Sequence, residues 1–148
     1  MTPPDPDYAA RVARGFKAQG FMALLGAELI SVAPGVVEIA LPLRPALSQH
    51  HGYAHAGATW AIADTAAGFA AQTLMAAADG VLTVEVKINL LSPAKGARLI
   101  ARGTVERAGR RLTVARADVV AVAEDGRESA VALALGTFMT LPGLADAD

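Results

Sequence analysis

Alternating apolar and polar residues predict most of the β-strands in this sequence. Apolar side chains occupy the even positions of residues 83–90 and polar side chains the odd positions, so that one face is apolar and the other polar. Two extended runs at 27–32 and 36–41 flank Ala33-Pro34-Gly35 and predict a hairpin. Further β-rich runs cover 97–106, 112–123 and 129–141, separated by turn residues at 108–109 and 124–126. We therefore expect a hairpin and a later meander of about four strands.

Two segments have helical patterns. Residues 8–19 carry Val12 and Phe16 four positions apart and predict a short amphipathic helix that stops at Gly20. From about residue 57 to 78, apolar residues cover every side of the helical wheel, and most of them are alanine. Such a helix must be surrounded by other elements, and its alanines let a sheet come close to its backbone. Residues 42–53 have the composition of a loop.

The order of these elements predicts an α+β fold, in which one antiparallel β-sheet of about six strands is wrapped around one long central helix. The chain has 148 residues, of which 53% are apolar, and contains no linker-like stretch in its middle. These values are typical of a single domain with a sizeable core rather than of a disordered or two-domain protein.

Composition excludes several classes of function. The chain carries 13 Lys and Arg against 14 Asp and Glu, so no overall field would draw it to nucleic acid or to an anionic membrane. With no cysteine, it can form neither a disulfide nor a thiolate metal site, and it has no cysteine nucleophile. Residues 1–8 lack the pattern of a secretory signal, and we expect a cytoplasmic protein. The segment 55–78 is too rich in alanine, with Asp64 at its centre, to span a membrane.

Asp64 is the first candidate for chemistry. A carboxylate on an otherwise apolar helix costs several kcal/mol, unless it is paired, hydrogen-bonded or protonated, and such residues usually have a functional role. The alternative is that Asp64 is the N-cap of a helix that begins at Thr65.

All three histidines, His50, His51 and His55, gather just before the long helix. His51 and His55 have the i, i+4 spacing of metal ligands, but no glutamate follows His51 and a glycine comes next, so we expect no metal. The imidazoles can instead bond to the loop backbone. The small residues Ala56 and Gly57 leave N–H groups open at the start of the helix, which predicts a site for an anion or a carbonyl oxygen.

A basic cluster of Arg107, Arg110 and Arg111 is the third candidate, with Arg116 and Lys95 further away in the sequence. It could bind the phosphates of a nucleotide-bearing ligand, or it could be the solvated tip of a hairpin. No glycine-rich phosphate loop supports ATP or NAD, and no G-x-S-x-G surrounds any serine.

The run from His55 to Asp64 resembles the H-G-G-x6-D signature of the hotdog-fold acyl-CoA thioesterases, in their phenylacetate-pathway (PaaI-like) group. Further matches are 25–28 followed by 33–35, the strand 83–89 running into 92–94, and 109–111. Together they cover roughly residues 21–142, which we expect to form a hotdog thioesterase domain. Residues 1–20 then form a leader with a short helix, and 143–148 form a C-terminal tail.

The resemblance implies roles for six residues. Asp64 is the general base or nucleophile toward the thioester carbonyl. The backbone N–H of Ala56, together with that of Gly57, polarises the carbonyl oxygen, and His55 shapes that turn. Gln49 lies where related enzymes often have an asparagine that orients the thioester or water. Thr83 matches a hydroxyl that holds the attacking water, and it is expected from the other subunit of a dimer.

The resemblance also implies how substrate is bound. The CoA phosphates are expected at Arg110, Arg111 or Lys95, with Asn89 as a further binding residue and the acyl or aryl group in an apolar pocket against the helix. We expect an acyl-CoA thioesterase without a cofactor, acting as a homodimer or homotetramer.

Two alternatives to hydrolysis stay open at this point. Ala56 replaces the first glycine of the signature and Gln49 replaces the asparagine, which suggests a non-catalytic acyl-CoA-binding module. A hotdog enoyl-CoA hydratase or dehydratase would use His55 and Asp64 as acid and base.

Overall fold

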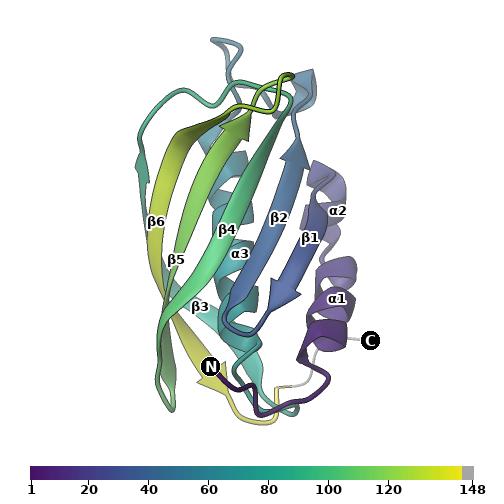
Figure 1. Cartoon of the computed structure of the whole chain (residues 1–148), viewed down its shortest axis with the longest axis vertical. Coiled ribbons are helices and arrows are strands. Elements are labelled where there is room, and N and C mark those ends of the chain that lie inside the picture. The colour runs from purple at the N-terminus through teal and green to yellow at the C-terminus, as the bar shows by residue number, and fades with distance from the viewer. Residues whose placement is uncertain (145–148) are drawn as a thin grey trace.

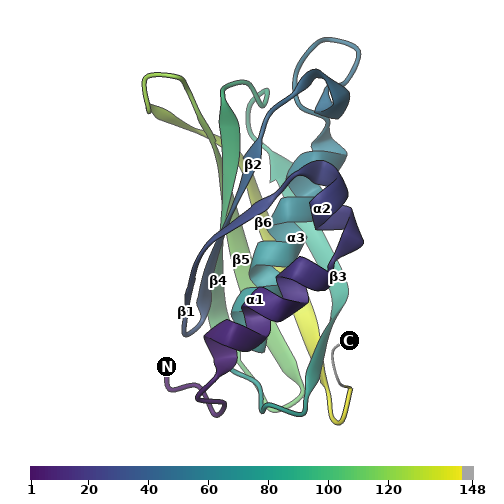
Figure 2. The same cartoon turned by 90° about the vertical axis from the view of Figure 1, so that its right-hand side faces the viewer.

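The central feature of the fold is helix α3 (Ala56–Gln72), around which a six-stranded antiparallel sheet curls (Figure 1). This computed structural model describes residues 1–144. Helices α1 (Tyr8–Ala18) and α2 (Gly20–Leu25) lie beside α3 (Figure 2). The arrangement confirms the expected α+β hotdog fold, in which an antiparallel sheet wraps around one central helix.

The sheet order is β1-β2-β4-β5-β6-β3. The bounds of the strands are β1 (Glu28–Ala33), β2 (Val36–Pro42), β3 (Gly80–Leu90), β4 (Arg98–Ala108), β5 (Leu112–Val122) and β6 (Glu128–Leu141). All predicted strands are present. The predicted meander is wrong at its first strand, because β3 pairs with β6 and not with β4, the next strand in the sequence. Strand β4 already has β2 and β5 as neighbours, so β3 takes the free side of β6 and becomes an edge of the sheet.

The ends of the helices differ from the prediction in two places. The long helix ends at Gln72 rather than near residue 78, because Thr73 Oγ1 donates to the carbonyl of Ala70 and accepts from the N–H of Gly35, both at 2.7 Å. These bonds tie the end of α3 to the β1–β2 turn. Gly20 does follow the end of the first helix, but it also begins the short helix α2, which the sequence pattern did not indicate.

The packing of α3 explains its alanine content. Ala63, Ala66 and Ala70 are fully buried. At Gly103 on β4 a Cβ atom would lie only 2.3 Å from the carbonyl carbon and oxygen of Ala66, so the sheet touches the helix backbone there. This contact confirms that small side chains allow the sheet to approach. No helix within residues 1–144 is long and apolar enough to cross a membrane.

The leader predicted for residues 1–20 packs onto the rest of the fold, with Val12 fully buried in the core. The boundary of the leader at residue 20 stays a prediction. Of the predicted tail 143–148, residues 145–148 lie outside the described part of the chain.

Arg11 on α1 holds the segment that follows α3. Only 5% of its surface is exposed. Its two Nη atoms donate to the carbonyls of Gln72 at 2.8 Å, Ala76 at 2.6 Å and Met75 at 3.1 Å, and its Nε lies 3.3 Å from Asp5 Oδ2. A helix leaves its last carbonyls without partners, and a cation there is favourable. Arg11 therefore joins the leader to the C-terminal end of α3.

Replacing Arg11 should consequently destabilise the fold. We expect Arg11→Met to lower the free energy of unfolding by about 3 kcal/mol, because it leaves buried carbonyls and Asp5 without their partner. Urea unfolding followed by circular dichroism measures this. Arg14→Met on the exposed side of the same helix is the matched control, with an expected change within about 0.5 kcal/mol. Equal effects of the two substitutions would contradict this role.

Candidate active site

Asp64 lies in the middle of α3, two turns after its start, so the alternative of an N-cap is wrong. One of its carboxylate oxygens, Oδ1, accepts a hydrogen bond of 2.8 Å from Thr83 Oγ1 on β3. The two residues line a small recess of about 100 Å³, together with Gln19, Thr65, Gly68, Phe69 and Val81. The leader thus contributes a side chain, Gln19, that sequence reasoning did not connect with this carboxylate.

Thr83 lies beside Asp64 of its own chain, and its expected contribution to a site in the other subunit of a dimer stays a prediction. Its hydroxyl reaches Asp64 within a single chain, so no second subunit is needed to bring these two side chains together. The physical reason is the sheet order: β3 is the edge strand, and it passes beside the central part of α3. Strict alternation placed Thr83 on the polar face of β3 with Glu85, and this placement is wrong. The register shifts between Thr83 and Glu85, so that Thr83 faces α3, as Val86 and Ile88 do.

The environment of Asp64 changes its protonation. Burial raises the pKa of the Asp64 carboxyl above its ordinary value, and the hydrogen bond from Thr83 opposes part of this rise. A carboxyl with a raised pKa is a better proton acceptor at neutral pH than an ordinary aspartate. Asp64 therefore has the properties of a general base.

The start of α3 presents one open donor. His55 is the N-cap, and its Nδ1 accepts from the N–H of Gly57 at 2.8 Å. That bond uses the N–H of Gly57, whereas the N–H of Ala56 has no acceptor among residues 1–144. A Cβ at Gly57 would lie 3.0 Å from His55 Nδ1, so glycine makes room for the imidazole. Ala56, at the positive end of the helix, is left as the donor for a ligand oxygen.

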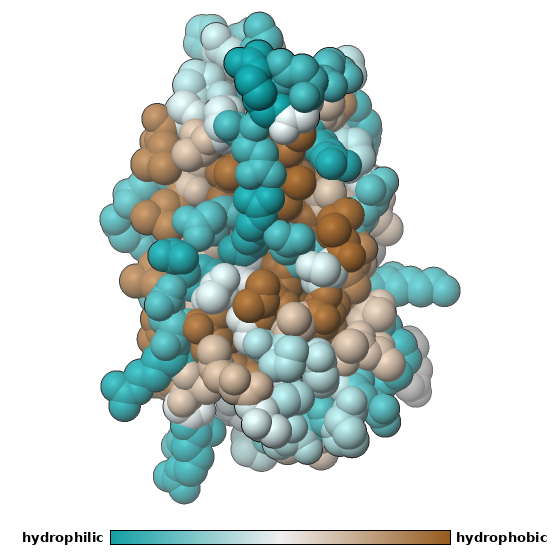
Figure 3. All heavy atoms as spheres, in the orientation of Figure 1, coloured by the Kyte–Doolittle hydropathy of each residue, from teal (hydrophilic) through white to brown (hydrophobic). Residues whose placement is uncertain are grey.

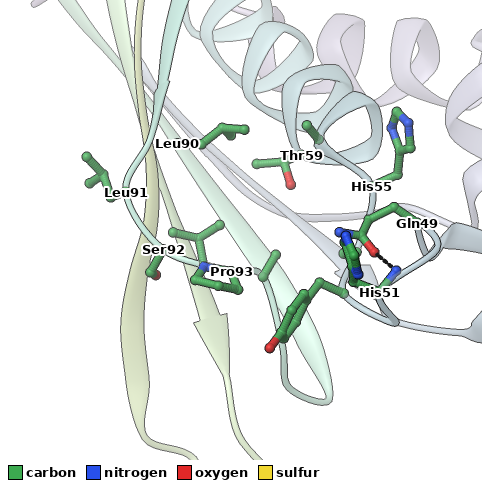
Figure 4. A pocket seen from close by; sticks show the side chains of 13 residues that line it. Gln49, His51, His55, Thr59, Leu90, Leu91, Ser92 and Pro93 are labelled. Carbon is green, nitrogen blue, oxygen red and sulfur yellow. Dashed lines mark hydrogen bonds between the residues drawn. The ribbon is translucent and has the colours of Figure 1, made fainter.

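A cavity of about 600 Å³ opens beside Ala56 (Figure 4). It lies between the loop before α3 and the segment that follows β3. Apolar groups make up most of its wall; the lining residues are Gln49, His51, Tyr53, Ala54, His55, Ala56, Thr59, Leu90, Leu91, Ser92, Pro93, Ala94 and Val131. A cavity of this size and character is typical of a site for an organic ligand.

Two polar side chains of this cavity have groups free for a ligand. Gln49 Oε1 accepts from the N–H of His51. The Nε2 of the same side-chain amide, which can donate two hydrogen bonds, has no partner in the described chain. Thr59 is only 1% exposed, and its hydroxyl points into the cavity without a hydrogen bond to residues 1–144 (Figure 4). Sequence reasoning missed Thr59, because a threonine in an apolar helix gives no signal until the cavity is known.

The expected site residues form two separate groups within one chain. Gln49, His55 and Ala56 lie at the start of α3, whereas Asp64 and Thr83 lie further along it. Eight residues separate Ala56 from Asp64, which is roughly 12 Å along a helix at 1.5 Å per residue. A single carbonyl group cannot touch both positions of the same chain.

The expected phosphate ligands are also separated. Arg110 and Arg111 are exposed in the β4–β5 turn, whereas Lys95 precedes β4 at the opposite end of the sheet. The 11 residues of β4 lie between them, a span of roughly 35 Å at 3.3 Å per residue. Asn89 does not line the cavity, and its Oδ1 accepts from Lys87 Nζ at 3.0 Å.

The three histidines of the loop before α3 differ in their surroundings. The rings of His50 and His51 are in contact, with centroids 3.9 Å apart, and of these two only His51 lines the cavity. Among residues 1–144, no group of three or more His, Cys, Asp and Glu side chains could hold a metal ion.

Comparison with known proteins connects this geometry to a family. The sequence model of the thioesterase superfamily matches residues 51–130, which include the start of α3, Asp64 and Thr83. A protein of Saccharolobus solfataricus whose name places it among the esterases is 31% identical over 123 residues, covering 83% of this chain and 79% of that protein.

Solved structures show the same fold. A thioesterase family protein of Silicibacter pomeroyi is 45% identical, with a TM-score of 0.89 over 92% of this chain and 99% of that one. The E. coli PaaI protein from the phenylacetic acid degradation operon has a TM-score of 0.80 over 92% of this chain and 94% of that one. Its identity of 20% supports likeness of fold alone.

The raised pKa of Asp64 predicts how stability depends on pH. Below the pKa of the unfolded chain the carboxyl is protonated in both states and has no effect on stability, and above the folded-state pKa the buried charge destabilises the fold. We expect Asp64→Asn to raise Tm at neutral pH, by an amount that shrinks as pH falls through the pKa of Asp64. Calorimetric melting from pH 3 to 8 tests this. A Tm difference that does not change with pH would contradict it.

Proposed function

We propose, because this chain belongs to the thioesterase superfamily, that it hydrolyses acyl-CoA thioesters with Asp64 as the catalytic carboxylate. The observation that carries this proposal is that α3 holds two complementary groups. One is the carboxyl of Asp64, whose pKa is raised by burial, and the other is the N–H of Ala56, which has no acceptor within residues 1–144. The first is suited to take a proton from water, and the second to bind the oxygen of a carbonyl.

The chemistry follows from these two groups. The thioester oxygen accepts from the N–H of Ala56, where the helix dipole stabilises the negative charge that develops on it. Asp64 takes a proton from water, whose oxygen bonds to the carbonyl carbon, and the C–S bond then breaks. The proton passes to the leaving sulfur, and the carboxylic acid that forms releases its own proton to solvent, so that the products are a carboxylate and the free thiol. The Nε2 group of Gln49 helps to orient the thioester, and Thr83 holds the carboxylate in position.

A complete site requires two chains, since Ala56 and Asp64 of one chain are too far apart to share a carbonyl. Ala56, Trp60 and Asp64 are four residues apart and form a single stripe along α3. Trp60, at its middle, is 38% exposed. A two-fold axis near Trp60 would bring Asp64 of one chain to Ala56 of the other, twice per dimer.

The edge strand β3 is suited to the same axis. Thr83 lies beside Asp64, whereas Leu90 lines the cavity with Ala56, so the midpoint of this segment, near Val86, is level with Trp60. Antiparallel pairing of two β3 strands about Val86 places Glu85 opposite the partner's Lys87. Pairing would also cover the open edge and the exposed side chains of Leu82, Val84 and Leu90.

The outer face of the sheet offers a second apolar surface. Hydrophobic residues gather on this face among polar ones (Figure 3), and Leu112, Leu133 and Leu135 are all exposed. We suggest that two dimers pack through it, as the homotetramer expected from the resemblance requires.

Hydrolysis is favoured over the two alternatives. A hydratase would use His55 and Asp64 as an acid–base pair, whereas the Nδ1 of His55 accepts from Gly57 at the start of α3, which gives this ring a role in holding the turn. A purely binding module was suggested by Ala56 and Gln49, yet Ala56 keeps its N–H and Gln49 keeps a free amino group. Thiol release separates these outcomes, because neither alternative breaks the C–S bond.

Thiol release from a panel of phenylacetyl-, benzoyl-, short- and medium-chain acyl-CoA substrates tests the function. We expect Asp64→Asn to abolish turnover and Ala56→Pro to lower kcat by about 100- to 1000-fold. Proline is accepted at the first position of a helix, so Ala56→Pro removes the N–H with little change to the backbone. Turnover by Asp64→Asn at the rate of the parent protein would rule out Asp64 as the catalytic group.

The two inactive variants also test the shared site. In a dimer of one Asp64→Asn and one Ala56→Pro chain, one site has both groups intact and the other has neither. If chains exchange freely, an equal mixture should recover about a quarter of the parent activity, because half of the dimers are mixed and each has one intact site. Purified mixed dimers with no activity would show that both groups act within one chain.

Thr83 should set the pH at which the enzyme loses activity. Removing its hydrogen bond takes away the interaction that lowers the pKa of Asp64. We therefore expect Thr83→Val to move the acid limb of kcat/KM to higher pH, since Asp64 must be ionised to act as a base. Thr83→Ser keeps the hydroxyl and should keep the profile of the parent protein. An unchanged acid limb in Thr83→Val would mean that the limb reports another group.

A further inference from the structure

The start of α3 offers a carbonyl oxygen only one backbone donor. Sites that stabilise negative charge developing on an oxygen commonly combine two hydrogen-bond donors. The N–H of Gly57 donates to His55 Nδ1, and the N–H groups of Ala58 and Thr59 donate to the carbonyl of His55. Among residues 1–144, the N–H of Ala56 is thus the backbone donor that stays open at this helix end. A second donor has to come from a side chain.

Thr59 carries a hydroxyl that faces the same cavity. The residue is only 1% exposed, and within residues 1–144 its Oγ1 has no hydrogen-bond partner. Figure 4 shows this hydroxyl directed into the cavity of about 600 Å³ that Ala56 also lines. Buried hydroxyl groups normally have a partner, because leaving one unpaired destabilises the fold. An unpaired hydroxyl aimed into a cavity therefore indicates a polar group of a ligand.

Other polar side chains of the cavity are less suited to this task. The hydroxyl of Ser92 donates to a backbone carbonyl of β6, and Tyr53 is exposed. Gln49 belongs to the loop before α3, whereas Thr59 lies on the same helix as Ala56. Two donors on one helix keep a fixed position relative to each other, which is the preorganisation that an oxyanion site requires.

The spacing of Ala56 and Thr59 allows them to share one acceptor atom. Residues three apart lie on the same face of a helix, with Cβ atoms roughly 5–6 Å apart. Helical side chains also lean toward the N-terminal end, which brings the hydroxyl of Thr59 toward the level of Ala56. Two donors that each lie about 2.9 Å from one oxygen are at most about 6 Å from each other. The two groups therefore fit a single oxygen beside the first turn of α3.

We propose that the hydroxyl of Thr59 is the second donor to the thioester carbonyl oxygen. This rests on the proposed function. When water bonds to the carbonyl carbon, an electron pair of the C=O bond moves onto the oxygen, and Thr59 and Ala56 both donate to it. When the C–S bond breaks, the pair returns to the C=O bond and both hydrogen bonds weaken. Thr59 is then a catalytic residue that comes from the same chain as Ala56.

Thr59→Val removes the hydroxyl and keeps the branched shape of the side chain. We expect it to lower kcat by about 100-fold and to leave KM nearly unchanged, because this hydrogen bond strengthens in the transition state. Thr59→Ser keeps the hydroxyl and should recover most of kcat. Thiol release from an acyl-CoA, and from the N-acetylcysteamine thioester of the same acyl group, measures these effects.

The two substrates share the carbonyl, so kcat should fall by the same factor for both. A raised KM for the acyl-CoA alone, with kcat unchanged, would mean that Thr59 binds the CoA moiety and would overturn the inference.

Thr73→Val is the matched control on the same helix end-to-end. Thr73 is fully buried, and its hydroxyl bonds to the carbonyl of Ala70 and to the N–H of Gly35. This substitution should lower Tm and leave kcat unchanged. Thr59→Val should do the reverse, because it removes a hydroxyl that has no partner in the fold. A fall in Tm as large as that of Thr73→Val, with kcat unchanged, would make the hydroxyl of Thr59 structural and overturn the inference.

Infrared spectroscopy separates failure of this inference from failure of the proposed function. The probe is benzoyl-CoA with an isotopic label at its carbonyl carbon, bound to Asp64→Asn so that it stays intact. Hydrogen bonds to the carbonyl oxygen lower the frequency of its stretching vibration. We expect a lower frequency in the bound than in the free probe, and a smaller shift in Asp64→Asn/Thr59→Val.

The same shift in both proteins, or no shift in either, overturns the inference even if thiol release by the parent protein is normal. Absence of thiol release from every substrate overturns the proposed function, whatever the spectra show.

Discussion

The close contact between helix α3 and the sheet is the constraint on which the other features of this molecule depend. At Gly103 the sheet touches the helix backbone so closely that even a methyl group would overlap Ala66. The helix can be surrounded this tightly only because alanines form the faces toward the sheet. One stripe of α3 lies at the open edge of the sheet, beside the edge strand β3, and that stripe carries Ala56, Trp60, which is 38% exposed, and Asp64. The packing that builds the core thus decides where chemistry can take place.

Stability and function are opposed at Asp64. Its carboxyl is in surroundings that raise its pKa, and within residues 1–144 this charge receives one side-chain hydrogen bond, from Thr83. A fully compensated carboxylate, such as Glu128 with its bidentate Arg102, has a lowered pKa and would be a weak base. The partial compensation of Asp64 keeps it reactive, and the stability that it costs is supplied elsewhere, for example by Arg11 at the end of the same helix.

Local patterns in the sequence were enough to predict the strands, the central helix and the wrapping of one by the other. They failed where a distant residue decides the outcome. The end of α3 depends on the bond between Thr73 and Gly35, 38 residues apart, and on Arg11, which is 61 residues away from its acceptor Gln72. The partner of β3 depends on which strand has a free side, and no feature of β3 itself encodes this. Asp64 and Ala56 could be named because charge in an apolar helix and small residues at its start are local signals. Thr59 could be recognised only once the cavity beside it was known.

The spacing of eight residues from Ala56 to Asp64 has a geometric consequence in the proposed dimer. Residues that act on the same group of a substrate have to be close together in space, yet Ala56 and Asp64 are about two turns apart on one helix. Such a spacing is useless within one site and useful across a two-fold axis, because the axis brings the start of one helix beside the middle of the other. The same eight-residue separation then determines how far two copies of α3 must slide past each other. The motif from His55 to Asp64 therefore belongs to two different sites of the proposed dimer. Each chain supplies Ala56 to one site and Asp64 to the other.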